Sequence, residues 1–180
     1  MAAGQHGDPM KTLTDDEITL RAKKIKLVLT DNDGVLTDTG VYYSDAGEMM
    51  KRFSIRDGMG VERLRDCGIE TGIITGELSG SIKARADKLH IKHLYLGIKD
   101  KPKKLLEILA KTDFKLEEIA YIGDDYNDLD IINTVHQKGL TAAPQDAMPK
   151  IIDAVIYHCN TNGGHGAFRD FAEWIIAHRY

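Results

Sequence analysis

Polar residues able to do phosphate chemistry follow short apolar runs at four places in this 180-residue chain. The first place supplies Asp31 and Asp33, the second Thr75, the third Lys101 and the fourth Asp124. Carboxylates gathered at one site repel one another and need a cation. Oxygen ligands without histidine or cysteine favour Mg²⁺, which shares its coordination sphere with phosphate groups. The pattern therefore predicts a magnesium site that binds a phosphate.

A carboxylate that attacks phosphorus needs its own charge neutralised and the phosphoryl oxygens held. Mg²⁺ and Lys101 would supply positive charge, while Thr75 and backbone N–H groups would donate hydrogen bonds. The carboxylate of Asp33 can protonate a leaving alkoxide and then deprotonate the water that breaks an aspartyl-phosphate. These roles together describe a phosphomonoester hydrolase.

Alternating strand and helix patterns would bring these residues together. Apolar runs predict strands at 25–30, 69–75, 94–96, 119–122, 140–142 and 154–156. Amphipathic or capped segments predict helices at 15–24, 58–66, 79–89, 102–110, 129–136 and 167–177. Such alternation indicates a doubly wound, mostly parallel α/β sheet whose ligands bind beyond the carboxyl ends of the strands.

One domain is expected at 11–180, after a polar leader or disordered tail at 1–10. It contains a β-hairpin insertion at about 39–53, with strands predicted at 40–44 and 48–53. The net charge of −4 argues against a nucleic-acid partner. No run reaches the roughly 18–20 apolar residues of a membrane span, and the N-terminal residues lack the apolar core that is typical of a signal peptide. We therefore expect a cytoplasmic protein. Its two cysteines, Cys67 and Cys159, are expected to be free thiols.

The four groups of residues also resemble a known set of motifs. The matching positions are Asp31-x-Asp33-Gly34-Val35-x-Thr37, Thr75, Lys101 and Gly123-Asp124-Asp125-x-x-Asp128. In order and spacing they resemble the four motifs of the haloacid dehalogenase (HAD) superfamily, which has a Rossmann-like fold. The resemblance implies that Asp31 is the nucleophile and a metal ligand. It also implies that Asp33 is the acid and base and binds the metal through its backbone carbonyl, with Asp124 as the third ligand.

The same resemblance assigns supporting roles at the site. It implies that Thr75 and Lys101 hold the phosphoryl group, with Gly76 beside them. Asp128 would orient Lys101 or a metal-bound water, and Asp125 would act in a similar way.

The short insertion distinguishes a branch of the superfamily, because it leaves room for a hairpin and not for a cap domain. Further segments resemble the small phosphatases of 3-deoxy-ulosonate sugar acids, namely Gly47-Glu48, Lys51, Phe53, Arg56-Asp57-Gly58-x-Gly60, Ala143-Pro144-x-Asp146-Ala147 and Gly163-Gly164-x-Gly166-Ala167-x-Arg169. That family is typically tetrameric, with the hairpin of one subunit over the site of the next. The resemblance implies a phosphorylated sugar acid as substrate, typically 3-deoxy-D-manno-octulosonate 8-phosphate of lipopolysaccharide biosynthesis.

The residues are divided on which sugar acid is bound. Arg56 resembles the eight-carbon type, whereas Glu77 and Lys88 resemble enzymes for nine-carbon 9-phosphates of the sialic-acid type. A Glu77–Lys88 pair would replace the arginine that usually follows Thr-Gly in the eight-carbon type. His165 and Arg169 could lie near a substrate carboxylate. The eight-carbon acid is the preferred prediction.

Two alternatives of other classes share this fold. A non-catalytic, oligomerising HAD-like domain would usually lose the nucleophile, but Asp31 is present. A receiver domain that is phosphorylated and keeps the phosphoryl group would gain nothing from the hydrolytic proton carrier Asp33.

Overall fold

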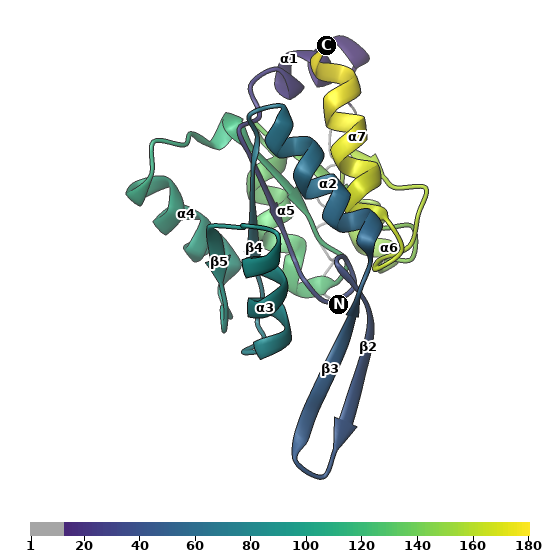
Figure 1. Ribbon diagram of the computed structural model, residues 1–180. Helices are drawn as coiled ribbons and strands as arrows, with labels where there is room; N and C mark the ends of the chain where they lie inside the picture. The colour runs from purple at the N-terminus through teal and green to yellow at the C-terminus, as the bar shows by residue number, and fades with distance from the viewer. Residues whose placement is uncertain (1–12) are drawn as a thin grey trace, which may run out of the picture.

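Six parallel strands form the central sheet of the computed structural model, which describes residues 13–180 (Figure 1). They are β1 Leu27–Thr30, β4 Glu70–Ile74, β5 His93–Tyr95, β6 Ile119–Ile122, β7 Leu140–Ala143 and β8 Tyr157–His158, in the order β5-β4-β1-β6-β7-β8. The chain winds outward from β1 in both directions, so the carboxyl end of β1 is the topological switch point where ligands bind. The predicted doubly wound α/β sheet is confirmed, and the predicted leader at 1–10 lies outside the described residues.

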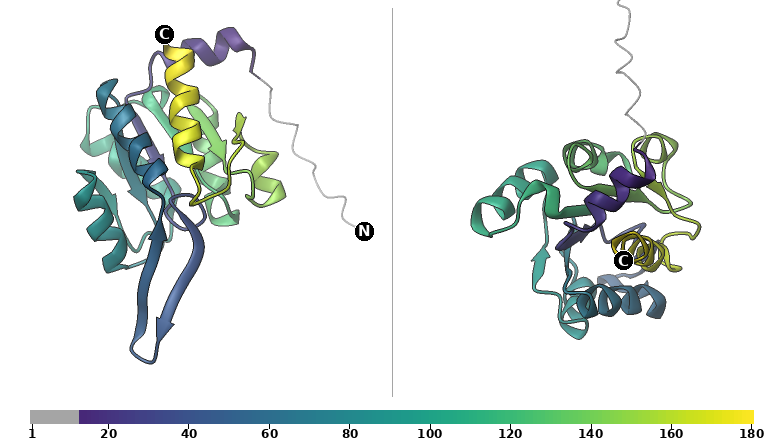
Figure 2. Two further views of the ribbon diagram at one scale, coloured as in Figure 1. Left: turned by 45° about the vertical axis from the view of Figure 1, so that its right-hand side comes forward. Right: turned by 90° about the horizontal axis from the view of Figure 1, so that it is seen from above.

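Helices cover both faces of the sheet (Figure 2). The first face carries α1 Asp15–Ala22, α2 Ile55–Asp66, α3 Gly80–Lys88 and α7 Ala167–Arg179, and the second carries α4 Lys101–Lys111, α5 Leu129–His136 and α6 Pro149–Ile152. Two short 3₁₀ turns, η1 Leu116–Glu118 and η2 Tyr126–Asp128, flank β6. Strand β1 is buried throughout because its side chains alternate: Val28 enters the first core, Leu27 and Leu29 the second. Among the described residues, no helix is long and apolar enough to cross a bilayer.

Local signals explain where several helices begin and end. Thr14 caps α1 in a reciprocal capping box with Glu17. Gly68, at φ 73°, follows α2, and the Ile69 N–H donates to the Leu64 carbonyl, which closes a Schellman motif. Asp100 caps α4 by accepting a hydrogen bond from the Lys103 N–H.

The last strand was predicted wrongly at 154–156. Pairing with β7 instead begins at Tyr157, which lies opposite Ala142. The Ala154 N–H still donates to the Ile151 carbonyl at the end of α6. The side chains of 154–156 pack against the two cores, and the Ile156 N–H donates to the Thr141 carbonyl of β7 at 3.2 Å, one residue before the strand begins.

The insertion is an antiparallel hairpin of β2 Thr37–Ser44 and β3 Gly47–Phe53. It projects from the body of the molecule at the end of the sheet that follows β1 (Figures 1 and 2). The register of β2 shifts between Thr37 and Val41, where Thr39 has φ 65°. A β-branched residue rarely adopts this left-handed conformation. The predicted hairpin is confirmed, and its first strand starts directly behind the loop after β1.

Helices α2 and α7 are joined by a buried aspartate. Asp57 is 2% exposed and accepts hydrogen bonds from the Gly166 and Arg169 N–H groups, both at 3.2 Å. These donors belong to the first turn of α7, which has no capping side chain of its own. The carboxylate of Asp57 therefore takes the place of an N-cap and fixes the start of α7 against α2.

Replacing Asp57 by alanine is expected to lower the free energy of unfolding by about 1–3 kcal/mol, because one buried and one partly buried N–H group lose their acceptor. Urea unfolding followed by circular dichroism measures the change. Asp66→Ala, at the exposed end of the same helix, is the matched control and should change stability by less than about 0.5 kcal/mol. Equal stabilities of the two variants would contradict the capping role.

Candidate active site

A cavity of about 510 Å³ lies at the carboxyl ends of the central strands. The predicted residues Asp31, Asp33, Thr75, Lys101 and Asp124 all line it. Asp31 and Asp33 follow β1, Thr75 follows β4, Lys101 begins α4 after β5, and Asp124 follows β6. The parallel sheet has therefore brought together residues that are up to 93 positions apart in the sequence (124 − 31). Gly76, Glu77 and Asp125 line the same cavity.

The loop after β1 makes close contacts that need glycine at two positions. Gly34 has φ +85°, and a Cβ there would lie 1.9 Å from Asp124 Oδ2. On the other side, a Cβ on Gly163 would lie 1.9 Å from the Gly34 carbonyl oxygen. The Gly164 N–H donates to the Val35 carbonyl at 2.8 Å. The glycine-rich segment 163–166 therefore packs against the loop after β1 of its own chain.

Asp31 has one oxygen held and one oxygen without a partner. Its Oδ1 accepts from the Asn32 N–H at 2.7 Å and lies 3.1 Å from the Lys101 ammonium. Its Oδ2 has no hydrogen-bond partner among residues 13–180, and the side chain borders the cavity. Burial raises the pKa of Asp31 to about 7, with Asp128 adding to the rise and Lys101 opposing it. The free oxygen is the one positioned to act as a nucleophile.

Lys101 is held by a buried acidic residue as well as by Asp31. Its Nζ lies 2.6 Å from Asp128 Oδ1, an oxygen that also accepts from the Tyr121 hydroxyl at 2.6 Å. The other oxygen, Asp128 Oδ2, accepts from the Asp124 and Asp125 N–H groups at 3.0 and 3.4 Å. Burial lowers the pKa of Lys101, but the charges of Asp31 and Asp128 outweigh this effect and the net pKa is raised. Lys101 therefore stays charged in a position where it can contact a phosphoryl oxygen.

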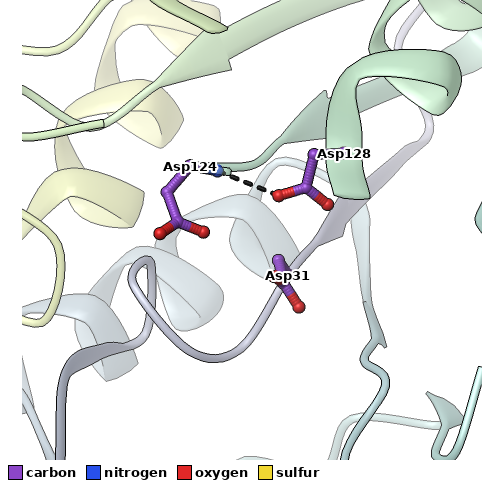
Figure 3. A group of neighbouring side chains, drawn as sticks. All are labelled: Asp31, Asp124 and Asp128. Atoms are coloured by element: carbon purple, nitrogen blue, oxygen red, sulfur yellow. Dashed lines mark hydrogen bonds between the residues drawn. The ribbon is translucent and has the colours of Figure 1, made fainter. Parts of the chain in front are cut away.

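Three carboxylates form the acidic centre of the cavity (Figure 3). One oxygen from each of Asp31, Asp124 and Asp128 lies within 4.8 Å of the others. Asp124 Oδ1 is buried without a hydrogen-bond partner among the described residues. The pKa of Asp124 is raised to about 8, mainly by burial and then by the charges of Asp31 and Asp128, with Lys101 opposing the rise.

These observations fit a divalent cation. Asp31 and Asp124 have unpaired oxygens that a hard cation could bind, whereas both oxygens of Asp128 already accept hydrogen bonds. Oxygen donors of this kind suit Mg²⁺. The ligand role predicted for the Asp33 backbone carbonyl remains a prediction.

Thr75 and Asp33 border the cavity with groups that are partly engaged. Thr75 Oγ1 accepts the Glu77 N–H at 3.2 Å, which leaves its hydroxyl proton available to an anion. Asp33 Oδ1 accepts from Lys51 Nζ at 2.7 Å and from Thr37 Oγ1 at 3.1 Å. Asp33 Oδ2 is buried and has no partner among residues 13–180, so one oxygen remains for proton transfer.

The residues predicted to bind the rest of a substrate are less well gathered. Glu77 lines the cavity, but Lys88 lies at the other end of α3, and no ion pair joins them among the described residues. Arg56 and His165 border a separate hollow of about 430 Å³ near the base of the hairpin. Arg169 pairs with Glu173 at 2.7 Å. The predicted Glu77–Lys88 pair is therefore wrong within one chain, because the length of α3 separates the two residues.

Sequence reasoning missed three residues of this site. Tyr121 was read only as part of a buried strand, and its hydrogen bond to Asp128 gives no local signal. Lys51 was noted as part of a matching segment without a role. Lys99 lines the cavity and donates to the Gly76 carbonyl at 3.3 Å. Its place two residues before Lys101 could have suggested this position.

Comparisons with known proteins agree with this geometry. No protein-family model matches the chain. The 3-deoxy-D-manno-octulosonate 8-phosphate phosphatase KdsC of Yersinia pestis is 37% identical over 161 residues, which are 89% of this chain and 84% of that protein. The crystal structure of the Moraxella catarrhalis 3-deoxy-D-manno-octulosonate 8-phosphate phosphatase, in complex with magnesium ion, phosphate ion and KDO, aligns with a TM-score of 0.84 at 34% identity, covering 91% of this chain and 92% of that one. The cobalt-bound Haemophilus influenzae phosphatase aligns with a TM-score of 0.83 at 34% identity, covering 88% of this chain and 91% of that one.

Asp124→Asn is expected to raise the melting temperature of the metal-free protein. The folded-state pKa of about 8 lies above the ordinary value of 3.8. Ionised Asp124 therefore costs stability increasingly as the pH rises between these values. One pKa unit corresponds to about 1.4 kcal/mol, so the gain should be larger at pH 8 than at pH 5, and Mg²⁺ should stabilise the variant less than the wild type.

Thermal unfolding in EDTA and in Mg²⁺ measures both effects. Asp130→Asn, on the exposed face of α5, is the matched control and should show neither. A gain that does not depend on pH would argue against repulsion within the acidic centre.

Proposed function

This chain belongs to the family of 3-deoxy-D-manno-octulosonate 8-phosphate phosphatases, which are phosphomonoester hydrolases of the HAD superfamily. We propose that it hydrolyses the terminal phosphate ester of a 3-deoxy-ulosonate sugar acid. The observation that carries the proposal is the meeting of Asp31, Asp33, Lys101 and Asp124 around one cavity. We propose 3-deoxy-D-manno-octulosonate 8-phosphate as the substrate, which would place the enzyme in lipopolysaccharide biosynthesis.

The first step is transfer of the phosphoryl group to Asp31. The free oxygen of Asp31 attacks phosphorus while Lys101 and the Thr75 hydroxyl contact the phosphoryl oxygens. The ester P–O bond breaks as the Oδ2–P bond forms. Asp33 gives a proton to the departing alkoxide, which would otherwise be a poor leaving group.

The second step is hydrolysis of the aspartyl-phosphate. Asp33, now ionised, takes a proton from a water molecule that attacks phosphorus opposite Asp31. Breaking the Oδ2–P bond releases inorganic phosphate and returns both carboxylates to their starting states. Asp128 does not touch the substrate in this scheme, and acts by holding Lys101 in place.

Asp31 and Asp124, together with the Asp33 backbone carbonyl, are proposed to hold Mg²⁺. When bound, the cation neutralises the acidic centre and polarises the phosphoryl oxygens. The unpaired oxygens and raised pKa values of Asp31 and Asp124 support this assignment.

The choice of sugar acid depends on the mouth of the cavity. The relatives named for the octulosonate 8-phosphate favour the eight-carbon acid. Glu77, however, occupies the rim where the eight-carbon type usually presents an arginine, and this observation keeps a nine-carbon 9-phosphate as the second candidate. Lys99 also lines the cavity and could meet a substrate carboxylate.

We also propose that four copies assemble, with each hairpin covering the cavity of a neighbour. The hairpin exposes large apolar side chains that a single chain leaves in water: Tyr42 is 61% exposed, Tyr43 71%, Met49 58% and Met50 52%. Side chains of this kind favour burial in an interface. Assembly could also bring the hollow of Arg56 and His165 toward a neighbouring cavity, which would restore the substrate contacts predicted for them.

Asp31→Asn is expected to abolish turnover with Mg²⁺ present while the protein remains folded, because an amide cannot form the acyl-phosphate. Release of inorganic phosphate from 3-deoxy-D-manno-octulosonate 8-phosphate measures turnover, and rapid quenching with mass spectrometry should find the phosphoryl group on residue 31 in the wild type. Asp87→Asn, exposed on α3, is the control. Activity of Asp31→Asn close to that of the wild type would rule out the nucleophile.

Glu77→Arg is expected to raise the preference for the eight-carbon acid about tenfold, because a guanidinium can hold a carboxylate with paired hydrogen bonds. The ratio of kcat/KM for the eight-carbon 8-phosphate and a nine-carbon 9-phosphate measures preference. Glu62→Arg, exposed on α2, provides the same charge change away from the cavity. An unchanged ratio would remove Glu77 from substrate selection.

A further inference from the structure

The side chain of Lys51 points from the hairpin toward the loop after β1. Only 2% of it is exposed, whereas Arg52 beside it on β3 exposes 46% of its side chain. Neighbouring residues of a strand point to opposite faces, so Lys51 lies on the face of β3 that meets the loop after β1. A buried lysine is uncommon and needs a charged partner.

Asp33 is that partner. Lys51 Nζ lies 2.7 Å from Asp33 Oδ1, the oxygen that also accepts from Thr37 Oγ1 at 3.1 Å and Asn32 Nδ2 at 3.2 Å. Three donors on one oxygen fix the rotation of the carboxyl group. Oδ2 is buried and has no partner among residues 13–180. The three hydrogen bonds to Oδ1 therefore leave Oδ2 as the oxygen available for proton transfer.

A second carboxylate connects Lys51 to the start of α3. Glu48 Oε2 lies 3.8 Å from Lys51 Nζ, and Glu48 Oε1 accepts from Ser79 Oγ at 2.5 Å. Ser79 is the N-cap residue of α3 and is 6% exposed. The contacts therefore run from α3 through β3 to the loop after β1, which gives Lys51 a defined position on a hairpin that otherwise projects into solvent.

We infer that Lys51 is a positioning residue, which holds the Asp33 carboxyl group so that Oδ2 faces the ester oxygen of the substrate. The inference rests on the proposed function, in which Asp33 delivers a proton to the leaving alkoxide. During that transfer Oδ1 keeps its three hydrogen bonds and the proton leaves from Oδ2. The hairpin then has a role within its own chain, in addition to any cover that it gives a neighbour.

The test compares two leaving groups, because only one of them needs the proton. An alkoxide leaves the sugar-acid phosphate with help from Asp33, whereas 4-nitrophenolate leaves 4-nitrophenyl phosphate without it. Lys51→Met should lower kcat/KM for 3-deoxy-D-manno-octulosonate 8-phosphate about 10²-fold, within the range of general acid catalysis. It should change kcat/KM for 4-nitrophenyl phosphate by less than about threefold, since kcat/KM reports transition-state stabilisation relative to free enzyme and substrate.

Lys51→Arg restores the charge and should recover part of the loss on the sugar-acid phosphate. Lys104→Met, which removes a lysine paired with Glu107 outside the cavity, is the matched control and should behave as the wild type on both substrates. Melting temperatures establish that each variant is folded. If Lys51→Met fails to fold, the same comparison of substrates is made with Lys51→Arg, whose displaced guanidinium should still slow the sugar-acid phosphate more than the aryl phosphate.

Equal losses on both substrates, or no loss on either, would overturn the positioning role. Failure of the proposed function has a different signature, because the wild type would then not hydrolyse the sugar-acid phosphate. If the wild type hydrolyses 4-nitrophenyl phosphate but not the sugar acid, a simple primary alkyl phosphate replaces the sugar acid in the same comparison. The test of Lys51 therefore does not depend on the identity of the sugar.

Discussion

Electrostatic repulsion within the acidic centre is the constraint on which the rest of the structure depends. Asp31, Asp124 and Asp128 bring carboxylate oxygens within 4.8 Å of one another, and Lys101 is the ammonium group paired with two of them. Burial is the largest cause of the raised pKa values of Asp31 and Asp124, and the neighbouring carboxylates add to the rise because one ammonium group cannot balance three negative charges. The chain tolerates this arrangement because buried parallel strands fix the three backbones and the cores on both faces hold the strands.

The two carboxylates of the loop after β1 have different partners although they are two residues apart. Asp31 is paired with Lys101 at the start of α4, and Asp33 is paired with Lys51 on β3. Each pair holds one oxygen and leaves the other free. The nucleophile and the proton carrier of the proposed mechanism are therefore held by different lysines, one on α4 and one on β3.

Glycines make the close approach of these segments possible. Gly34 leaves room for the Asp124 carboxylate, and Gly163 lies directly against Gly34. Asp146 accepts a hydrogen bond from the Gly163 N–H at 2.9 Å and so fixes the glycine-rich segment to the loop after β7. Packing around the loop after β1 therefore accounts for several of the segments that resemble the sugar-acid phosphatases, and none of these segments needs to contact the substrate for this role.

The sequence by itself determined the fold class, most element boundaries and which residues meet at the cavity beyond β1. Buried strands, caps such as Thr14 and turn glycines such as Gly68 act over a few residues, and the ends of parallel strands must meet at one edge of the sheet. Tertiary structure alone decided the partners of those residues. The bonds from Tyr121 to Asp128 and from Lys51 to Asp33, the capping of α7 by Asp57 and the distance between Glu77 and Lys88 all depend on how distant segments pack. Such contacts leave no periodic or local signal, because a side chain's partner across the fold is set by three-dimensional distance and not by position along the chain.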